Sequence, residues 1–230
     1  MIDPVRDLDS VREATERLLT AVDTLDRTRL SGPSRLPGWS RGHVLAHLAR
    51  NADALVNVLE GRPMYPSAAA RETDIERDSG RPLDVQLADV RDSAAQFEAV
   101  ARLPAEWNRT VALRNGVTDR AARVPFRRLV EVELHHVDLD VGHELEDLPR
   151  EFVLREIAFL AERFTGSPQV PPVALSAASG ESWTTGGTAG ARVSVEGPAP
   201  ELLGWLAGRR AVRASGLTTG GGPLPVLPPL

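Results

Sequence analysis

Two pairs of polar side chains in this sequence share the spacing of one helical turn. His43 and His47 stand four residues apart, and Glu131 and His135 repeat that offset far downstream. Residues four apart on an α-helix project from the same side. Two helices that each offer such ligands can build a metal site in the core of a helical bundle. The spacing therefore predicts a centre that binds a divalent cation through imidazole and carboxylate groups.

The preferred ligands are His47, Glu131 and His135, which supply two nitrogens and one oxygen. Catalytic zinc sites commonly use three protein ligands and keep one position for water or substrate. This set suits Zn²⁺ best, with Ni²⁺, Co²⁺ or Fe²⁺ as alternatives. His43 is the rival of His47, but it falls in the first helical turn, nearer to solvent. The competing interpretation is that these side chains only make ordinary hydrogen bonds or salt bridges.

Three further polar residues lie close to the second pair in the sequence. His136 points about 100° away from His135 around a helix axis, and His143 falls at the end of the predicted helix. We expect both to be surface or capping residues rather than ligands. Asp138 could orient a ligating imidazole, but an exposed carboxylate is the preferred interpretation.

Composition narrows the classes of function. The net charge of -5 argues against a nucleic-acid-binding protein, which normally presents a basic face. The chain has no long apolar run that could span a bilayer. Asp3, Asp7 and Asp9 stand where a signal peptide would be basic and then apolar. We therefore expect a cytoplasmic protein that contacts neither nucleic acid nor a membrane.

The chain contains no cysteine. Disulfides, thiolate metal sites and a cysteine nucleophile are therefore excluded. A metal would have to be held by imidazole and carboxylate groups. Chemistry that needs a thiol would have to obtain that thiol from a second molecule.

The first 148 residues contain the elements that must position the ligands. Apolar side chains recur with a helical period over residues 5–28, 40–60, 83–102 and 125–141. A long polar connection covers residues 64–82, with a short helix predicted around 68–77. A short strand or hairpin is predicted at Thr110 to Val117, around Asn115 and Gly116. Four long helices predict a four-helix bundle over residues 1–148.

The character of the sequence changes after Pro149. An amphipathic helix is predicted over residues 151–164, and a short helix over 198–208. Short strands separated by glycine-rich turns are predicted over residues 173–176, 182–185 and 192–196. Residues 220–230 are expected to form an extended tail or edge strand. Residues 149–230 therefore predict a small α+β domain, and the whole chain an α+β multidomain protein.

Several stretches resemble motifs of one known family. The segment WSRGHVLAH at residues 39–47 is similar to the opening motif of the DinB-like metalloprotein superfamily. Within it, three further stretches resemble the mycothiol-dependent maleylpyruvate isomerase family: PMY at 63–65 with Ala70-Arg71, EVELHHVDL at 131–139, and the stretch from VEG at 195–197 to AGR at 207–209. The similarity covers about residues 36–210.

The resemblance implies a fold, a ligand set and a reaction. It implies a DinB-like four-helix bundle followed by a small α+β domain, with zinc or another divalent metal on His47, Glu131 and His135. It also implies that Arg71 and Arg209 serve the active site, in catalysis and in binding the cosubstrate mycothiol. The implied reaction is cis–trans isomerisation of maleylpyruvate to fumarylpyruvate, as in gentisate degradation, by thiolate addition, bond rotation and elimination.

Two alternatives stay open beside this reaction. One is a mycothiol S-transferase that acts on another electrophile, and the other is a metal-binding regulatory protein without catalysis. For the isomerase we expect a monomer whose partners are its small-molecule substrate and mycothiol.

Overall fold

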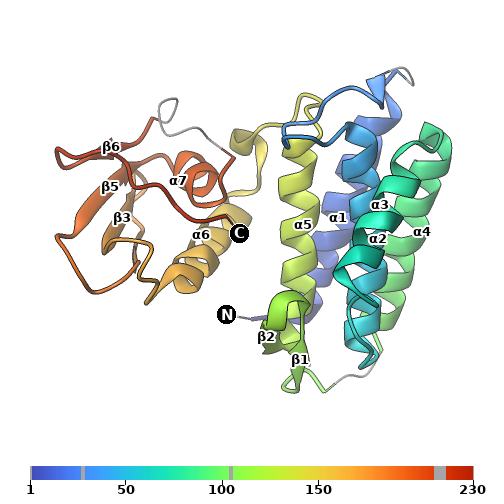
Figure 1. The fold of residues 1–230 in the computed structure, drawn as a ribbon, viewed down its shortest axis with the longest axis horizontal. Coiled ribbons are helices and arrows are strands. Elements are labelled where there is room, and N and C mark those ends of the chain that lie inside the picture. Colours follow the sequence, from blue (N-terminus) through green and yellow to red (C-terminus); the bar gives the residue numbers. More distant parts are fainter. Residues whose placement is uncertain (1, 27–28, 104–105, 210–215, 230) are drawn as a thin grey trace. The chain divides into compact units, whose positions relative to one another are not determined.

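The computed structural model describes residues 2–26, 29–103, 106–209 and 216–229 (Figure 1). The chain divides into two compact units, Met1–His143 and Glu144–Leu230. Across the described ranges, no helix is both long and apolar enough to cross a membrane.

The first unit is a helical bundle. Its described helices are α1 (Pro4–Asp23), α2 (Arg41–Leu59), α3 (Ala68–Ser79), α4 (Leu83–Ala101) and α5 (Val124–Asp138). α1 and α2 each pack against both α4 and α5, so these four helices enclose one core, and α3 packs against α2. The core side chains are apolar, as the helical period requires; they include Leu18, Leu45, Leu55, Phe97 and Val137. The predicted four-helix bundle is confirmed, and so is the short helix predicted around residues 68–77.

α2 begins where Ser40 caps it. The Ser40 hydroxyl accepts a hydrogen bond from the N–H of His43 (3.3 Å), and His43 Nδ1 accepts one from the N–H of Ser40 (3.1 Å). This reciprocal pair is a capping box, which satisfies N–H groups that a helix start otherwise leaves without partners. The capping box sets the point at which α2 starts, and therefore the face on which His47 lies one turn later.

Gly42 allows the end of α3 to approach the start of α2. A β-carbon at this position would lie 2.1 Å from the carbonyl oxygen of Ser79, the last residue of α3. The same oxygen accepts a hydrogen bond from Gln86 Nε2 of α4 (2.9 Å). The end of α3 is thus held between two helices, and only glycine leaves room for it.

α5 ends at Asp138, before the predicted end at residue 141. Asp140 and Gly142 have φ angles of 55° and 92°, which a right-handed helix cannot contain. The carbonyl of Leu139 accepts a hydrogen bond from Arg41 Nε of α2 (2.8 Å) rather than from a further helical turn. A tertiary contact therefore replaces the helical one, although the apolar period continues.

α1 is also shorter than predicted. It ends at Asp23, where the N–H of Thr24 bonds to the carbonyl of Val22. The predicted end at residue 28 lies outside the described residues, as does residue 230 of the predicted tail.

The predicted hairpin between α4 and α5 is confirmed. β1 (Thr110–Ala112) pairs antiparallel with β2 (Thr118–Arg120). The connecting 3-10 turn η2 (Arg114–Gly116) contains Asn115 at φ 58° and Gly116 at φ 72°, a left-handed conformation that these two residue types tolerate best. A second 3-10 turn, η3 (Ala121–Arg123), leads into α5.

The second unit is a small α+β domain, which confirms the predicted fold class. Its described helices are η4 (Leu145–Asp147), α6 (Arg150–Phe164) and α7 (Ala199–Leu206). The strands follow the order β4-β3-β5-β6 and span Ser182–Thr185, Val173–Ala177, Val193–Gly197 and Thr218–Thr219. Leu175 of β3 lies opposite Trp183 in the antiparallel β4 and opposite Val195 in the parallel β5. The short edge strand β6 precedes the tail, in which Pro225 accepts a hydrogen bond from Trp205 Nε1 (3.0 Å).

We predict that Gly42→Ala destabilises the first unit. The new methyl group would overlap the Ser79 carbonyl, so α3 must shift, and overpacking of this kind costs about 1–3 kcal/mol. Urea unfolding followed by circular dichroism measures this loss. Gly80→Ala is the matched control, because a β-carbon there meets no atom within 4 Å; equal losses in the two variants would contradict the prediction.

Candidate metal centre

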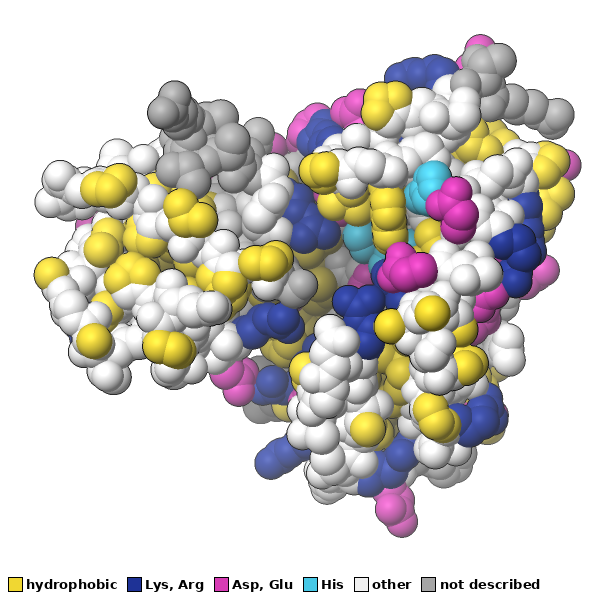
Figure 2. Space-filling view, in the orientation of Figure 1, with side chains coloured by type: hydrophobic (Ala, Val, Ile, Leu, Met, Phe, Trp, Pro, Cys, Tyr) yellow, Lys and Arg dark blue, Asp and Glu magenta, His cyan; other side chains and the backbone are white. Residues whose placement is uncertain are grey.

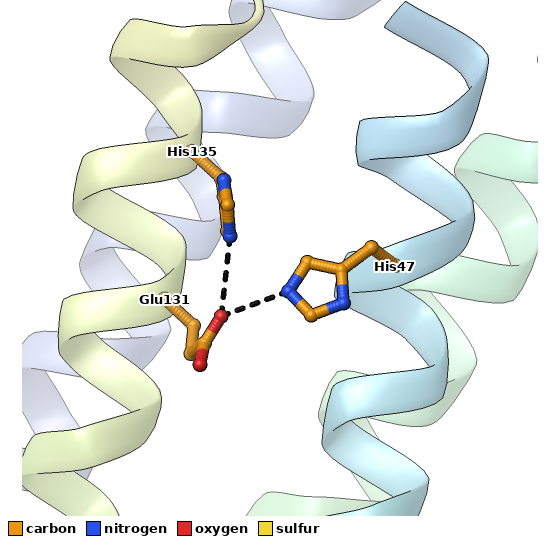
Figure 3. A group of neighbouring side chains, drawn as sticks. All are labelled: His47, Glu131 and His135. Atoms are coloured by element: carbon orange, nitrogen blue, oxygen red, sulfur yellow. Dashed lines mark hydrogen bonds and ion pairs between the residues drawn. The ribbon is translucent and has the colours of Figure 1, made fainter. Parts of the chain in front are cut away.

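Three side chains predicted as ligands meet between α2 and α5 (Figure 3). His47 Nε2 lies 2.9 Å from Glu131 Oε2, and His135 Nε2 lies 3.2 Å from the same oxygen. Among the residues that the structure describes, His47, Glu131 and His135 form the group of histidine and acidic side chains that could hold a metal ion. Their ligand atoms all lie within 4.8 Å of one another. The structure therefore brings together all three residues of the predicted set.

The spacing of these atoms fits a four-coordinate cation. Zinc bonds to histidine nitrogen at about 2.0–2.1 Å, so neighbouring ligand atoms of a tetrahedral site lie about 3.3 Å apart. The distances from the His47 and His135 nitrogens to Glu131 Oε2, 2.9 and 3.2 Å, are close to that value, and all the ligand atoms lie within 4.8 Å of one another. The side chains of His47 and His135 are buried, whereas 32% of the Glu131 side chain is exposed. A cation at this position would be reached from the side of Glu131.

Burial and mutual hydrogen bonds set the protonation of the three groups. Burial lowers the pKa of His47 to about 4, although Glu131 opposes the shift. Burial alone would raise the pKa of Glu131, but hydrogen bonds from His135 and His47 outweigh it and keep that pKa well below 4.5. Near neutral pH, His47 is a neutral imidazole and Glu131 a carboxylate. These are the forms that bind a metal ion.

His135 is oriented by a buried carboxylate. Its Nδ1 lies 2.8 Å from Asp138 Oδ2, and Asp138 is fully buried in the last turn of α5. Burial acts to lower the pKa of His135, but the bonds to Asp138 and Glu131 raise it above its ordinary value. A carboxylate behind a ligating imidazole fixes its ring orientation and increases its basicity. The expectation of an exposed Asp138 is wrong, because the end of α5 lies within the bundle.

His43, the rival ligand, is engaged elsewhere. Besides its role in the capping box, its Nε2 lies 3.1 Å from Glu76 Oε2 of α3. Both ring nitrogens therefore have partners away from His47 and Glu131. The choice of His47 over His43 agrees with this geometry.

His136 is buried rather than exposed. Its ring stacks on that of His143, with centroids 3.9 Å apart and planes at 11°. The expectation of a surface position for His136 is wrong, because α5 packs against α1 on one side and α2 on another and so buries most of its circumference.

Arg71 lies directly behind His47. Its Nη2 is 3.1 Å from His47 Nδ1, and its guanidinium carbon lies 5.9 Å from the centre of the Tyr65 ring. The indole of Trp39 lies on another side, with its ring centroid 5.5 Å from that of His47. Composition alone makes Arg71 a surface charge, whereas the structure buries it. Arg209 belongs to the second unit, where it donates to the carbonyl of Ala207 (2.7 Å).

Trp39 and Tyr65 were not predicted as site residues. Trp39 directly precedes the Ser40 cap, and Tyr65 is the single tyrosine of the chain. Such aromatic residues beside the polar motifs are the signal that could have drawn attention to them. Figure 2 shows histidine side chains beside acidic ones at the surface of the molecule. Among the three candidate ligands, the Glu131 side chain is 32% exposed. Part of the site is therefore open to solvent.

Comparison with known proteins decides the family. The family models for the mycothiol maleylpyruvate isomerase N-terminal domain and the MDMPI C-terminal domain match residues 11–140 and 147–229. The chain belongs to the mycothiol maleylpyruvate isomerase family. The resemblance found in the sequence is therefore confirmed.

Solved structures of this family share the whole fold. A crystal structure of mycothiol-dependent maleylpyruvate isomerase is 26% identical, with a TM-score of 0.89 over 99% of this chain and 97% of the other. A variant of that enzyme with a histidine-to-alanine substitution is 25% identical, with the same TM-score and coverage. No curated protein matches the chain.

We predict that His47→Ala abolishes tight binding of Zn²⁺. The variant removes one of three ligands. Loss of a residue that only orients a ligand lowers metal affinity about 10–100-fold, so loss of the ligand itself should lower the affinity for Zn²⁺ further. Isothermal titration of the metal-free protein measures this affinity. His43→Ala is the control: it removes the side-chain acceptor of the Ser40 N–H but keeps the bond from the residue-43 N–H to the Ser40 hydroxyl, and it should bind zinc as the wild type does. Equal weakening in both variants would contradict the assignment.

We predict that His47 makes the metal-free protein acid-sensitive. Its pKa is about 4 in the folded state and near 6.5 in the unfolded chain, so protons favour unfolding as the pH falls between these values. The free energy of unfolding should drop by up to about 3 kcal/mol from this group. Urea unfolding of wild type and His47→Gln at pH 7 and pH 4 isolates the effect, because the variant has no titrating group there. A difference between the two proteins that is constant with pH would oppose this prediction.

Proposed function

We propose that this chain is a mycothiol-dependent maleylpyruvate isomerase that converts maleylpyruvate to fumarylpyruvate. The observation that carries the proposal is the convergence of His47, Glu131 and His135 in a member of this family that contains no cysteine. The site has ligands for a cation, and the chain has no nucleophilic sulfur of its own. Both features fit an enzyme that borrows a thiol.

The reaction requires a carbon–carbon double bond to rotate. Addition of the mycothiol sulfur to the conjugated alkene leaves a single bond and places negative charge on the adjoining carbonyl as an enolate. Rotation about the single bond and collapse of the enolate then expel the sulfur and restore the double bond in the trans form. The thiol is regenerated, so substrate and product differ only in geometry.

His47, Glu131 and His135 would hold Zn²⁺ or a similar divalent cation. Such a cation, when bound, lowers the pKa of a thiol at its open coordination position, which makes the thiolate available near neutral pH. Two nitrogens and one oxygen suit this role, since three protein ligands leave one position for the thiol. Asp138 contributes by fixing the ring of His135 through Nδ1.

Arg71 is the residue that we propose to act on the substrate, and its contact with His47 supports this role. A guanidinium group only donates hydrogen bonds, so His47 Nδ1 accepts the bond from Arg71 and the ring proton lies on Nε2, facing Glu131. If His47 held a cation through Nε2, its ring proton would have to lie on Nδ1, which could then no longer accept. The donors of Arg71 would in that case be available for a substrate carboxylate or for the enolate oxygen. For Arg209, the same role rests on the family resemblance.

We predict thiol-dependent isomerisation that needs both arginines. Purified zinc-loaded protein should convert maleylpyruvate only when mycothiol is present, followed by ultraviolet absorbance. Arg71→Ala and Arg209→Ala should keep zinc and lose at least about 100-fold in turnover, the scale on which loss of a charge-stabilising donor acts. Arg77→Ala, on the exposed side of the helix that carries Arg71, is the control and should retain activity.

The same assay separates the alternatives. Thiol conjugation of a generic electrophile such as chlorodinitrobenzene, without isomerisation of maleylpyruvate, would indicate an S-transferase instead. Protein that binds zinc but turns over neither compound would overturn the enzymatic proposal and favour a regulatory role.

A further inference from the structure

Arg128 is a buried cation within the bundle, three residues before Glu131 on α5. Its side chain is fully buried. Burial lowers its pKa to about 10, which still leaves it protonated at neutral pH. Burying a guanidinium group costs free energy unless its N–H groups donate hydrogen bonds, so the hydrogen-bond partners of Arg128 indicate its role.

The hydrogen bonds of Arg128 all lead to α2. Its Nη1 donates to the carbonyl of Leu48 (2.8 Å) and to Asn51 Oδ1 (2.9 Å). Leu48 directly follows His47, and Asn51 lies one helical turn after it. The remaining donors, Nε and Nη2, are buried and have no hydrogen-bond partner within the described ranges. Arg128 is thus bonded to the ligand-bearing segment of the neighbouring helix and, among the described residues, to no carboxylate.

The metal centre depends on the alignment of these two helices. Figure 3 shows that His47 reaches Glu131 and His135 from a separate helix. A shift of α2 along α5 would carry the His47 nitrogen away while the other two ligands stayed together. Functional groups need to be held to within about 0.5 Å, and apolar packing is non-directional. Directional bonds from Arg128 to α2, beside His47, supply that constraint.

We infer that Arg128 is a positioning residue for the metal centre, which holds α2 in register with α5 through Leu48 and Asn51 so that His47 reaches a cation held by Glu131 and His135. The inference rests on the metal-binding part of the proposed function and is independent of the identity of the substrate. It differs from a general contribution to stability, which would change the population of folded protein but not the affinity of the folded protein for metal.

Cobalt titration tests this inference. Metal-free wild type, Arg128→Met and Arg128→Lys are titrated with Co²⁺, whose visible absorption reports both affinity and coordination geometry, at a temperature where circular dichroism shows each protein folded. Arg128→Met should bind Co²⁺ at least about tenfold more weakly, the lower end of the loss expected when a group that orients a metal ligand is removed, and show an altered d–d spectrum. Arg128→Lys, which keeps a donor and the charge, should recover part of the affinity.

Arg17→Met is the matched control. Arg17 of α1 donates to the buried Glu133 of α5 (2.6 Å), so its loss also removes an interhelical bond and lowers stability. It should leave Co²⁺ affinity and spectrum unchanged. Wild-type affinity and spectrum in Arg128→Met, or equal weakening in Arg17→Met, would overturn the inference.

A milder variant covers the case in which Arg128→Met does not fold. Asn51→Ala removes one acceptor and keeps the guanidinium, and should weaken Co²⁺ binding several-fold; unchanged binding there would also overturn the inference. Wild type that binds Co²⁺ but fails to isomerise maleylpyruvate would overturn the proposed reaction and leave the role of Arg128 intact.

Discussion

A single carboxylate oxygen joins the two helices on which the site depends. Glu131 Oε2 lies within hydrogen-bond distance of imidazole nitrogens from both α2 and α5. The buried imidazoles and the half-buried carboxylate are stable together because the three groups divide charge between them: Glu131 remains anionic, His135 holds its proton more tightly than usual, and His47 is neutral. Opposite charges and shared protons offset the desolvation that each group would suffer alone. The same convergence offers a cation two nitrogens and an oxygen.

Much of the first unit serves to maintain this alignment. The Ser40 capping box sets the start of α2 and thereby the face of His47. Asp138 holds the ring of His135. The close contact between Gly42 and the end of α3 fixes the position of α3. Arg71, which lies on α3, bonds to the Nδ1 side of the His47 ring. Local sequence features and tertiary contacts therefore act on the same few atoms.

The sequence was sufficient to predict what depends on periodicity. Apolar spacing located the four bundle helices, and the two i, i+4 pairs contain the three side chains that the structure brings together, because both patterns follow from the geometry of a single helix. Glycine and asparagine in the hairpin were equally informative, since few residues tolerate positive φ.

Properties that depend on packing between helices could not be predicted in this way. The burial of Asp138 and His136 follows from how many neighbours surround α5, and helical period does not report that number. The early end of α5 follows from Arg41, a residue distant in the sequence that donates a hydrogen bond to the carbonyl of Leu139. Arg71 stood out from 27 basic residues only through family resemblance. The link from Arg128 to α2 requires knowledge of which faces meet.

X-ray absorption at the zinc edge tests the central claim most directly, because it reports the atoms bound to the ion in the wild-type protein. We expect nearest neighbours of nitrogen and oxygen at about 2.0–2.2 Å, with more distant scattering from two imidazole rings. A zinc ion surrounded only by oxygen, or by a single imidazole, would contradict the claim that α2 and α5 share one cation.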